Sequence, residues 1–207
     1  MSDSLPAVRV IKLGGSLLEL GDLEQRFEDW NSRQTQAVSI LIVGGGQPVD
    51  AIRHKVQHNS MDAAEIHWNC IEAMDQNSRT IASKFRNWKL VTDVNKIQPD
   101  ACPSNLVLAP LRWCQEYAIH LPTSWDVTSD SISAEFAGWI KARELVLLKS
   151  ADPPTGNNIP AAIEKGYVDP YFLAAIEQGN QRFATHAKFL VRAVNIRDAA
   201  FRETNLL

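Results

Sequence analysis

A lysine and a glycine turn follow the first apolar segment of the chain, and together they suggest phosphate binding. Ile11-Lys12-Leu13-Gly14-Gly15-Ser16 ends that segment, and a second apolar segment, 38–43, runs into Gly44-Gly45-Gly46 about thirty residues later. Glycines after a strand let the backbone approach an anion closely, and Lys12 supplies a mobile positive charge. This combination suits phosphoryl transfer, in which the protein mainly positions the reactants and neutralises charge. For either turn taken alone, an ordinary tight turn is the alternative.

Two better-known phosphate motifs do not occur in the sequence. There is no G-x-x-x-x-G-K-[ST] segment, and Gly44-Gly45-Gly46-Gln47 does not complete G-x-G-x-x-G. The sequence therefore favours neither a P-loop protein nor a Rossmann dinucleotide-binding protein.

Two carboxylates lie at the predicted start of a helix, in Trp125-Asp126-Val127-Thr128-Ser129-Asp130-Ser131. Ordinary capping is one interpretation, in which Asp126 or Thr128 accepts helix N–H bonds and Asp130 favours the helix dipole. In the functional interpretation, Asp130 lies near Lys12 and holds its ammonium group toward phosphates. That would be a positioning role rather than general-base chemistry.

Polar residues also follow a third apolar segment, in Leu147-Leu148-Lys149-Ser150-Ala151-Asp152. This segment is typical of a buried strand, and α/β folds gather their ligands at the carboxyl ends of such strands. We expect Lys149 to face either a nucleotide phosphate or solvent.

Hydrophobic periodicity predicts strands and helices that alternate along the chain. Strands are predicted at 7–13, 38–43, 90–91, 105–108, 145–149 and 189–194, the pair at 90–91 and the segment at 105–108 being short and buried. Helices are predicted at 22–33, from Pro48, at about 60–88, at 128–142, at 170–178 and from Arg197. This order indicates a three-layer αβα sandwich with a mostly parallel sheet. One face of the longest helix carries His67, Ile71, Met74, Ser78, Ile81 and Phe85.

Composition limits the classes of function. The 207 residues are 45% hydrophobic, enough for one domain with a core on both faces of a sheet. A formal charge of -3 with interspersed acidic and basic residues argues against a nucleic-acid partner. No apolar run approaches the roughly 20 residues that span a bilayer, and residues 1–6 lack a basic and an apolar leader region. A soluble, cytoplasmic protein is expected.

Cysteine usage fits the same compartment. Cys70, Cys102 and Cys114 are odd in number and far apart, with no CxxC pair. We expect reduced, buried thiols rather than disulfides or zinc ligands, and we predict no metal site made by the protein.

Four segments together resemble the amino acid kinase superfamily, which includes acetylglutamate, aspartate, uridylate and isopentenyl phosphate kinases. They are residues 12–16, 44–46 and 128–130 and the strand that ends at Lys149, in the order that this superfamily uses. The resemblance implies the carbamate kinase-like fold as a single domain, 1–207. Residues 1–125 would form mainly the acceptor-binding lobe and 126–207 mainly the nucleotide-binding lobe.

Within the superfamily, several segments look most like the short kinases of methanofuran biosynthesis, which act on [5-(aminomethyl)furan-3-yl]methyl phosphate. Besides 125–131 these segments are His120-Leu121-Pro122, His67-Trp68, Met74-Asp75 and Gly166-Tyr167-Val168-Asp169-Pro170-Tyr171-Phe172.

The resemblance also implies roles for individual residues. The catalytic residues would be Lys12, which stabilises the phosphates of ATP, and Asp130, which organises that lysine. ATP would further be bound by Gly14, Gly15, Ser16, Lys149, Ser150 and Asp152, and the acceptor and the transferred phosphoryl group would face Gly44, Gly45 and Gly46. Magnesium would be held mainly by the ATP phosphates.

The chain departs from the family pattern at two places. Asp152-Pro153 stands where the family often has Asp-Gly, and no Gly-x-Met-x-x-Lys segment supplies a second catalytic lysine. Either Lys149 substitutes for that lysine or one lysine suffices.

Four further residues are candidates for binding the acceptor, and a fifth, His120, is considered beside His67. Arg53 suits bidentate binding of a phosphate, with a solvated surface arginine as the alternative, and Asp50 on the same helix suits an amine. His67 is a ligand contact or a core histidine, and His120 has the same two interpretations. Trp125 is either a stacking platform for an aromatic acceptor or a core residue.

These observations predict an ATP-dependent kinase that phosphorylates a small phosphate monoester. Another acceptor, such as a nucleoside monophosphate, an isoprenoid phosphate or an amino-acid carboxylate, and a non-catalytic nucleotide- or anion-binding protein are the alternatives. A homo-oligomer is also expected, with Met61, Ile66, Trp68 and Met74 as a dimer face or, alternatively, as core.

Overall fold

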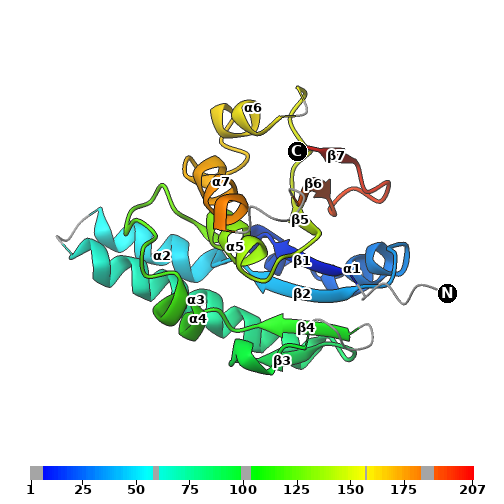
Figure 1. The fold of residues 1–207 in the computed structure, drawn as a ribbon, viewed down its shortest axis with the longest axis horizontal. Helices are drawn as coiled ribbons and strands as arrows, with labels where there is room; N and C mark the ends of the chain where they lie inside the picture. The colour runs from blue at the N-terminus through cyan, green and yellow to red at the C-terminus, as the bar shows by residue number, and fades with distance from the viewer. Residues whose placement is uncertain (1–6, 58–60, 99–103, 157, 183–188) are drawn as a thin grey trace.

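The computed structural model describes residues 7–57, 61–98, 104–156, 158–182 and 189–207. Its strands form one sheet in the order β3-β4-β2-β1-β5-β6-β7, in which every described pairing is parallel except β6 with β7 (Figure 1). The strands are β1 Val8–Leu13, β2 Val38–Val43, β3 Lys89–Val91, β4 Ser104–Leu108, β5 Glu144–Lys149, β6 Leu190–Asn195 and β7 Glu203–Asn205. The predicted mostly parallel sheet is confirmed.

Helices cover both faces of this sheet, as the predicted αβα sandwich requires. The α-helices are α1 Leu23–Ser32, α2 Gly46–Val56, α3 Ala63–Lys84, α4 Leu111–Tyr117, α5 Ser129–Trp139, α6 Ile159–Glu164 and α7 Phe172–Arg182. Two 3-10 helices are η1 Gly15–Glu19 and η2 Val94–Lys96. The sequence patterns did not predict α4, α6, η1 or η2, which are short.

The central strand β1 supplies both hydrophobic cores because successive side chains point to opposite faces. Val8 and Val10 belong to the core that contains α5, whereas Ile11 and Leu13 belong to the core that contains α1. By the same alternation Lys12 points to the α5 face. Both faces of β1 are buried, and four of its six residues are apolar; Arg9 and Lys12 are buried among them.

The long helix α3 contributes to both cores. Its N-cap Asp62 accepts hydrogen bonds from the amides of Ala64 and Glu65. Ile71 and Met74 pack into the α5 core, and its last turn packs into the α1 core. The six residues predicted to share one face are all buried: His67, Ile71, Met74, Ser78, Ile81 and Phe85.

Two predictions about local structure are wrong. No helix begins at Arg197, because the Asn195 side chain accepts the amides of Arg197 and Asp198 and closes a turn that leads into β7. Strand β3 is an edge strand that pairs with β4 alone among the described strands, so its Leu90 is exposed rather than buried.

The composition led to expectations about the cysteines and about membrane-spanning helices. Cys114 is buried, Cys70 is half-buried and both are free thiols, whereas Cys102 and residues 1–6 lie outside the described residues. Within the described ranges, no helix combines the length and apolar character that a membrane span needs.

Candidate functional site

The two glycine turns lie backbone against backbone at the carboxyl ends of β1 and β2. Gly14 donates to the Leu148 carbonyl and Gly44 to the Leu13 carbonyl, each over 2.8 Å. A Cβ on Gly15 would lie 2.2 Å from the Gly46 nitrogen, a distance that no side chain tolerates. Gly46 also has a φ of +55°, which favours glycine. The turns therefore require glycine because each is the neighbour of the other.

An asparagine on α3 holds the second turn in place. The side-chain amide of Asn77 donates to the carbonyl oxygens of Gly44 and Gly45, over 2.8 and 2.9 Å. With these carbonyls engaged from the α3 side, the shape of the turn is fixed before any ligand arrives. Sequence patterns gave no signal for Asn77, because the turn that it contacts lies more than thirty residues away.

A buried carboxylate joins the two lysines that the sequence singled out. Lys12 Nζ lies 2.7 Å from Asp130 Oδ1, and Lys149 Nζ lies 2.6 Å from Asp130 Oδ2. The three side chains are 5%, 15% and 6% exposed for Lys12, Lys149 and Asp130 respectively. Lys149 also donates to the Tyr167 carbonyl over 2.6 Å and does not extend into solvent, which was one of its two expected environments. The fold thus brings together residues from β1, β5 and α5.

Electrostatics in this cluster favour one carboxylate between two ammonium groups. Burial alone would raise the pKa of Asp130, but the charges of Lys12 and Lys149 outweigh it and lower that pKa to about 2. Burial, followed by the charge of Lys12, lowers the pKa of Lys149 to about 8, although Asp130 partly offsets this. Lys149 is therefore charged below pH 8 and loses its proton more readily than an ordinary lysine.

Helix α5 carries Asp130 in its first turn, and two side chains cap that turn. Thr128 is the N-cap and accepts from the Asp130 amide at 3.3 Å, as one interpretation of the sequence predicted. Asp126 is not the cap, because it pairs with Ser124 in the preceding loop. Asp169 also binds this turn. Its segment had been noted only for its resemblance to the methanofuran kinases, so its structural role was missed.

The residues predicted to bind ATP separate into a close group and one outlier. Ser16 and Ser150 lie together beyond the lysines, with their hydroxyl oxygens 2.9 Å apart. Asp152 instead turns toward β6 and the C-terminal segment, where its oxygens bind Asn195 Nδ2 and Arg202 Nη1, each at 2.7 Å. The carboxylate of Asp152 is thus already engaged by the protein.

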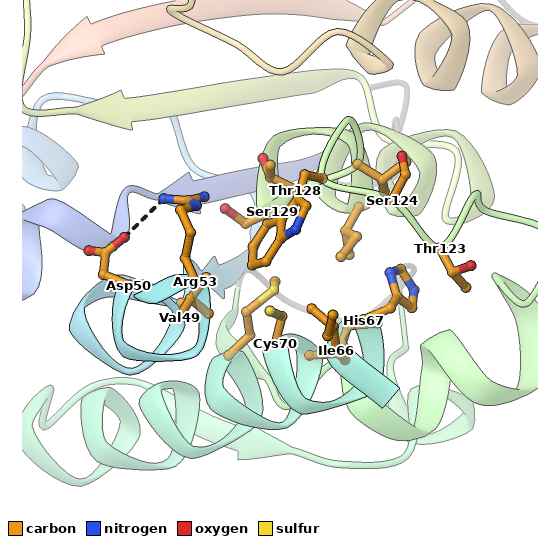
Figure 2. Close-up of a pocket in the computed structure, with 18 of the residues that line it drawn as sticks. Val49, Asp50, Arg53, Ile66, His67, Cys70, Thr123, Ser124, Thr128 and Ser129 are labelled. Atoms are coloured by element: carbon orange, nitrogen blue, oxygen red, sulfur yellow. Dashed lines mark hydrogen bonds and ion pairs between the residues drawn. The ribbon is translucent and has the colours of Figure 1, made fainter. Parts of the chain in front are cut away.

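A pocket of about 550 Å³ opens beside the glycine turns, between α2, α3 and the segment 123–132. Figure 2 shows Arg53 rising from α2 toward Thr128 and Ser129, with Cys70 and His67 on α3. Six of the seven residues predicted to bind the acceptor line this pocket, and Gly44 is the exception: Gly45, Gly46, Asp50, Arg53, His67 and Trp125. Gly15 and Ser16, predicted to bind ATP, also line it.

Charge in the pocket is concentrated at one end. Arg53 pairs with Asp50 at 3.1 Å, and its guanidinium lies 4.8 Å from the centroid of the Trp125 ring, which is 38% exposed. At the other end, burial lowers the pKa of His67 and favours its neutral form. Burial likewise raises the pKa of the Cys70 thiol. The arrangement suits a small ligand with an apolar body and a charged group at the Arg53 end.

Six apolar residues of the pocket were not predicted as ligand contacts, because apolar side chains in these patterns are typical of a core. They are Val49, Ile66, Ile71, Met74, Val127 and Ile132. Ile66 and Met74 had been predicted as a possible dimer face. His120 is not a pocket-lining residue and lies 3.0 Å from Glu135 of α5.

The site does not present a ready-made metal centre. Both oxygens of Asp130 face lysine ammonium groups, which does not fit a metal ligand. Among the residues that the structure describes, no cluster of three or more His, Cys, Asp or Glu side chains has the arrangement to hold a metal ion.

Comparison with solved structures identifies kinases with the same fold. The UMP kinase of Ureaplasma parvum has a TM-score of 0.62 at 14% identity, over 97% of this chain and 99% of that one. The uridylate kinase of Archaeoglobus fulgidus has a TM-score of 0.58 at 15% sequence identity, over 89% of this chain and 88% of that one. The aspartate kinase of Synechocystis has a TM-score of 0.64 at 12% sequence identity, over 97% of this chain but only 40% of the aspartate kinase. No protein-family model and no curated protein matches the sequence.

At these identities the likeness concerns the fold. The chain has the α/β fold of UMP and aspartate kinases, with a seven-stranded, mostly parallel sheet, which confirms the amino acid kinase fold that the four motifs predicted.

Proposed function

We propose that the protein is an ATP-dependent kinase that transfers the γ-phosphoryl group to a small acceptor bound in the pocket. One observation carries the proposal: Lys12 and Lys149 converge on buried Asp130, beside the interlocked glycine turns and the pocket. Phosphoryl transfer needs fixed positive charge and close positioning more than it needs acid or base chemistry. The kinases that share the fold support the same class of reaction.

The geometry gives each group a role in that reaction. Lys12 and Lys149 would contact the phosphates of ATP and neutralise charge that builds on the transferred group. Asp130, with both oxygens on lysines, would hold them in place rather than accept a proton. Gly15 and Gly46 would allow the acceptor and the nucleotide phosphates to approach the backbone from opposite sides.

The acceptor that best fits the pocket is a phosphate monoester with a small ring, and we propose [5-(aminomethyl)furan-3-yl]methyl phosphate. Its phosphate would lie at the end with Arg53 and Gly46, and the ring would contact Trp125 or the apolar floor. The product would be the corresponding diphosphate. UMP, isopentenyl phosphate and amino-acid carboxylates are the competing acceptors.

Magnesium would enter with the nucleotide in this proposal. The ion would be held by the ATP phosphates and would supply charge neutralisation between them. The two lysines would then share the remaining charge of the transferred group, because Asp130 is taken up in holding them.

An acceptor screen tests the proposal. Purified protein would be incubated with MgATP and each candidate acceptor, with ADP release and the phosphorylated product both measured. We expect turnover with at least one phosphorylated acceptor, and a loss of at least about 100-fold for Lys12→Ala, since one buried charge at the transferred group is removed. Lys84→Ala, which removes an exposed lysine at the far end of α3, is the matched control and should keep full activity. Absence of turnover with every acceptor would refute the kinase proposal.

A non-catalytic nucleotide- or anion-binding protein is the second candidate. It is favoured by the engagement of Asp152 with Asn195 and Arg202, and by the proline that follows it. Calorimetric titration distinguishes the two candidates: tight ATP binding that depends on Lys12, without product from any acceptor, would support the binding protein.

A further inference from the structure

Asp169 is a buried carboxylate that lies outside the predicted site but binds the helix that carries Asp130. Its Oδ2 accepts from the Thr128 amide at 2.9 Å, the Thr128 hydroxyl at 2.7 Å and the Ser131 amide at 3.1 Å. Its Oδ1 accepts from the Ser131 hydroxyl. Asp169 is only 7% exposed, so its charge is stabilised by these four hydrogen bonds rather than by water.

These hydrogen bonds hold residues on both sides of Asp130 along the chain. Asp130 lies between Thr128 and Ser131, the two residues that Asp169 holds. The Asp130 amide donates to the hydroxyl of the N-cap Thr128 over 3.3 Å, which is long for a hydrogen bond. Asp169 therefore supplies the stronger contacts to this turn. A carboxylate at a helix N-terminus is also favoured by the helix dipole.

The same segment also holds the second lysine. Two residues before Asp169, the Tyr167 carbonyl accepts from Lys149 Nζ at 2.6 Å, and the lysine lies 5.2 Å from the centroid of the Tyr167 ring. One short segment, 167–169, therefore contacts both Lys149 and the start of α5. It fixes the relative position of Lys149 and Asp130, which belong to different elements.

We propose that Asp169 is a positioning residue for phosphoryl transfer, acting through the first turn of α5 to align Asp130 between Lys12 and Lys149. The inference rests on the proposed kinase function. Thr128 and Ser129 also line the pocket, but Asp169 itself does not. Its loss is expected to reduce the rate of transfer more than the binding of the acceptor.

Two substitutions separate alignment from charge. Asp169→Ala removes all four hydrogen bonds. Asp169→Asn keeps an oxygen for the Thr128 and Ser131 amides, and its NH2 group can donate to the Ser131 hydroxyl, which is able to accept instead of donate. The shape of the contact is kept in Asn, whereas the negative charge is lost.

Asp93→Ala is the matched control for general destabilisation. Asp93 caps η2 by accepting the Asn95 amide at 3.1 Å and pairs with Arg112 at 3.4 Å. It precedes η2 and β4 near the β3 edge of the sheet, away from β1 and β5, which carry the lysines. Like Asp169→Ala, this variant removes a carboxylate that holds the first turn of a helix.

Kinetics at a temperature well below unfolding provide the first measurement. For Asp169→Ala we expect kcat to fall about 10- to 100-fold while KM for the acceptor changes less than about threefold, because misplacing a charged group mainly affects the transition state. Asp169→Asn should recover kcat to within about fivefold of the wild type, and Asp93→Ala should keep it. An unchanged kcat in Asp169→Ala, or a loss confined to KM, would overturn the inference.

Lysine reactivity provides a second measurement that needs no kinase activity. Reductive methylation followed by mass spectrometry would be compared at Lys12 and Lys149, which are nearly buried in the ion-pair cluster. Both should react faster in Asp169→Ala than in the wild type, and at the wild-type rate in Asp169→Asn and Asp93→Ala. Faster lysine labelling in a protein that phosphorylates no acceptor would support the positioning role and refute the kinase function. Unchanged labelling together with unchanged kcat in an active enzyme would refute the positioning role alone.

Discussion

Replacing Asp130 by asparagine tests the central cluster most directly, because the side chain keeps its size and loses its charge. In the wild type its two oxygens lie 2.7 and 2.6 Å from Lys12 and Lys149. At an effective dielectric constant of about 20, each pair has a gross attraction of about 6 kcal/mol, most of which is offset by desolvation. Removing the carboxylate leaves two buried ammonium groups facing each other.

We therefore expect Asp130→Asn to reduce the free energy of unfolding at pH 7 by about 3–5 kcal/mol, as for other broken buried ion pairs. For a domain of this size that corresponds to a fall in Tm of about 6–20 °C. Asp22→Asn, which breaks the exposed pair with Arg26, is the control and should shift Tm by less than about 2 °C.

The pH dependence of this difference gives a sharper test. The pKa of Asp130 is lowered from 3.8 to about 2 in the folded protein, which corresponds to about 2–3 kcal/mol of stabilisation. For a lowered carboxyl pKa, this stabilisation is present above about pH 4 and disappears as the pH falls through 2. Asp130→Asn lacks this stabilisation at every pH. The difference in the free energy of unfolding between the wild type and the variant should therefore narrow as the pH falls from 4 to 2.

A second narrowing of this difference in the free energy of unfolding is expected as the pH rises toward 8. Asp130 raises the pKa of Lys149, so in Asp130→Asn that lysine should become neutral below pH 8 and relieve the repulsion. Urea unfolding of both proteins from pH 2 to 9 measures the effect. A difference in the free energy of unfolding that stays constant over this range would refute the argument that charge, rather than packing, holds the cluster together.

Three further predictions concern the lysine and the glycines. Since Lys149 has a pKa of about 8, kcat/KM for ATP should fall above pH 8, and Lys149→Arg should move the fall beyond about pH 9.5 because arginine stays charged. Gly15→Ala should reduce activity by about 100-fold or more, since its Cβ would meet the Gly46 amide at 2.2 Å and displace a turn. Gly138→Ala should destabilise the protein by about 1–3 kcal/mol or more, because its Cβ would lie 2.4 Å from Gly179 Cα where α5 and α7 pack.

Each of these predictions has a clear contrary result. An alkaline fall that persists unchanged in Lys149→Arg would mean that another group titrates. Full activity in Gly15→Ala would show that the turns move apart without consequence for the site. Gly21→Ala is the control for both glycine variants, because a Cβ there would have no neighbour within 4 Å. A loss of stability at Gly21 as large as that at Gly138 would remove the packing explanation.

The major strands and longer helices of the fold were predictable because their signals are local. Strands 8–13, 38–43 and 144–149 are mostly apolar segments flanked by turn residues, and α3 has a helical repeat of apolar residues. The signal failed where contacts distant in sequence decide the structure. Asn195 closes the turn at 196–198 in place of the predicted helix, and the edge position of β3 leaves Leu90 exposed.

For the site, the sequence by itself determined the chemical groups and their order: a lysine, two glycine turns, an aspartate at a helix start and a second lysine. Only the tertiary structure decided that Asp130 binds both lysines at once and that Gly15 requires Gly46 as its neighbour. It also gave Asp169 a role that no local pattern indicated. The physical reason is that residue types set which interactions are possible, whereas distances and burial set their strength, and both arise only when parallel strands bring their carboxyl ends to one edge of the sheet.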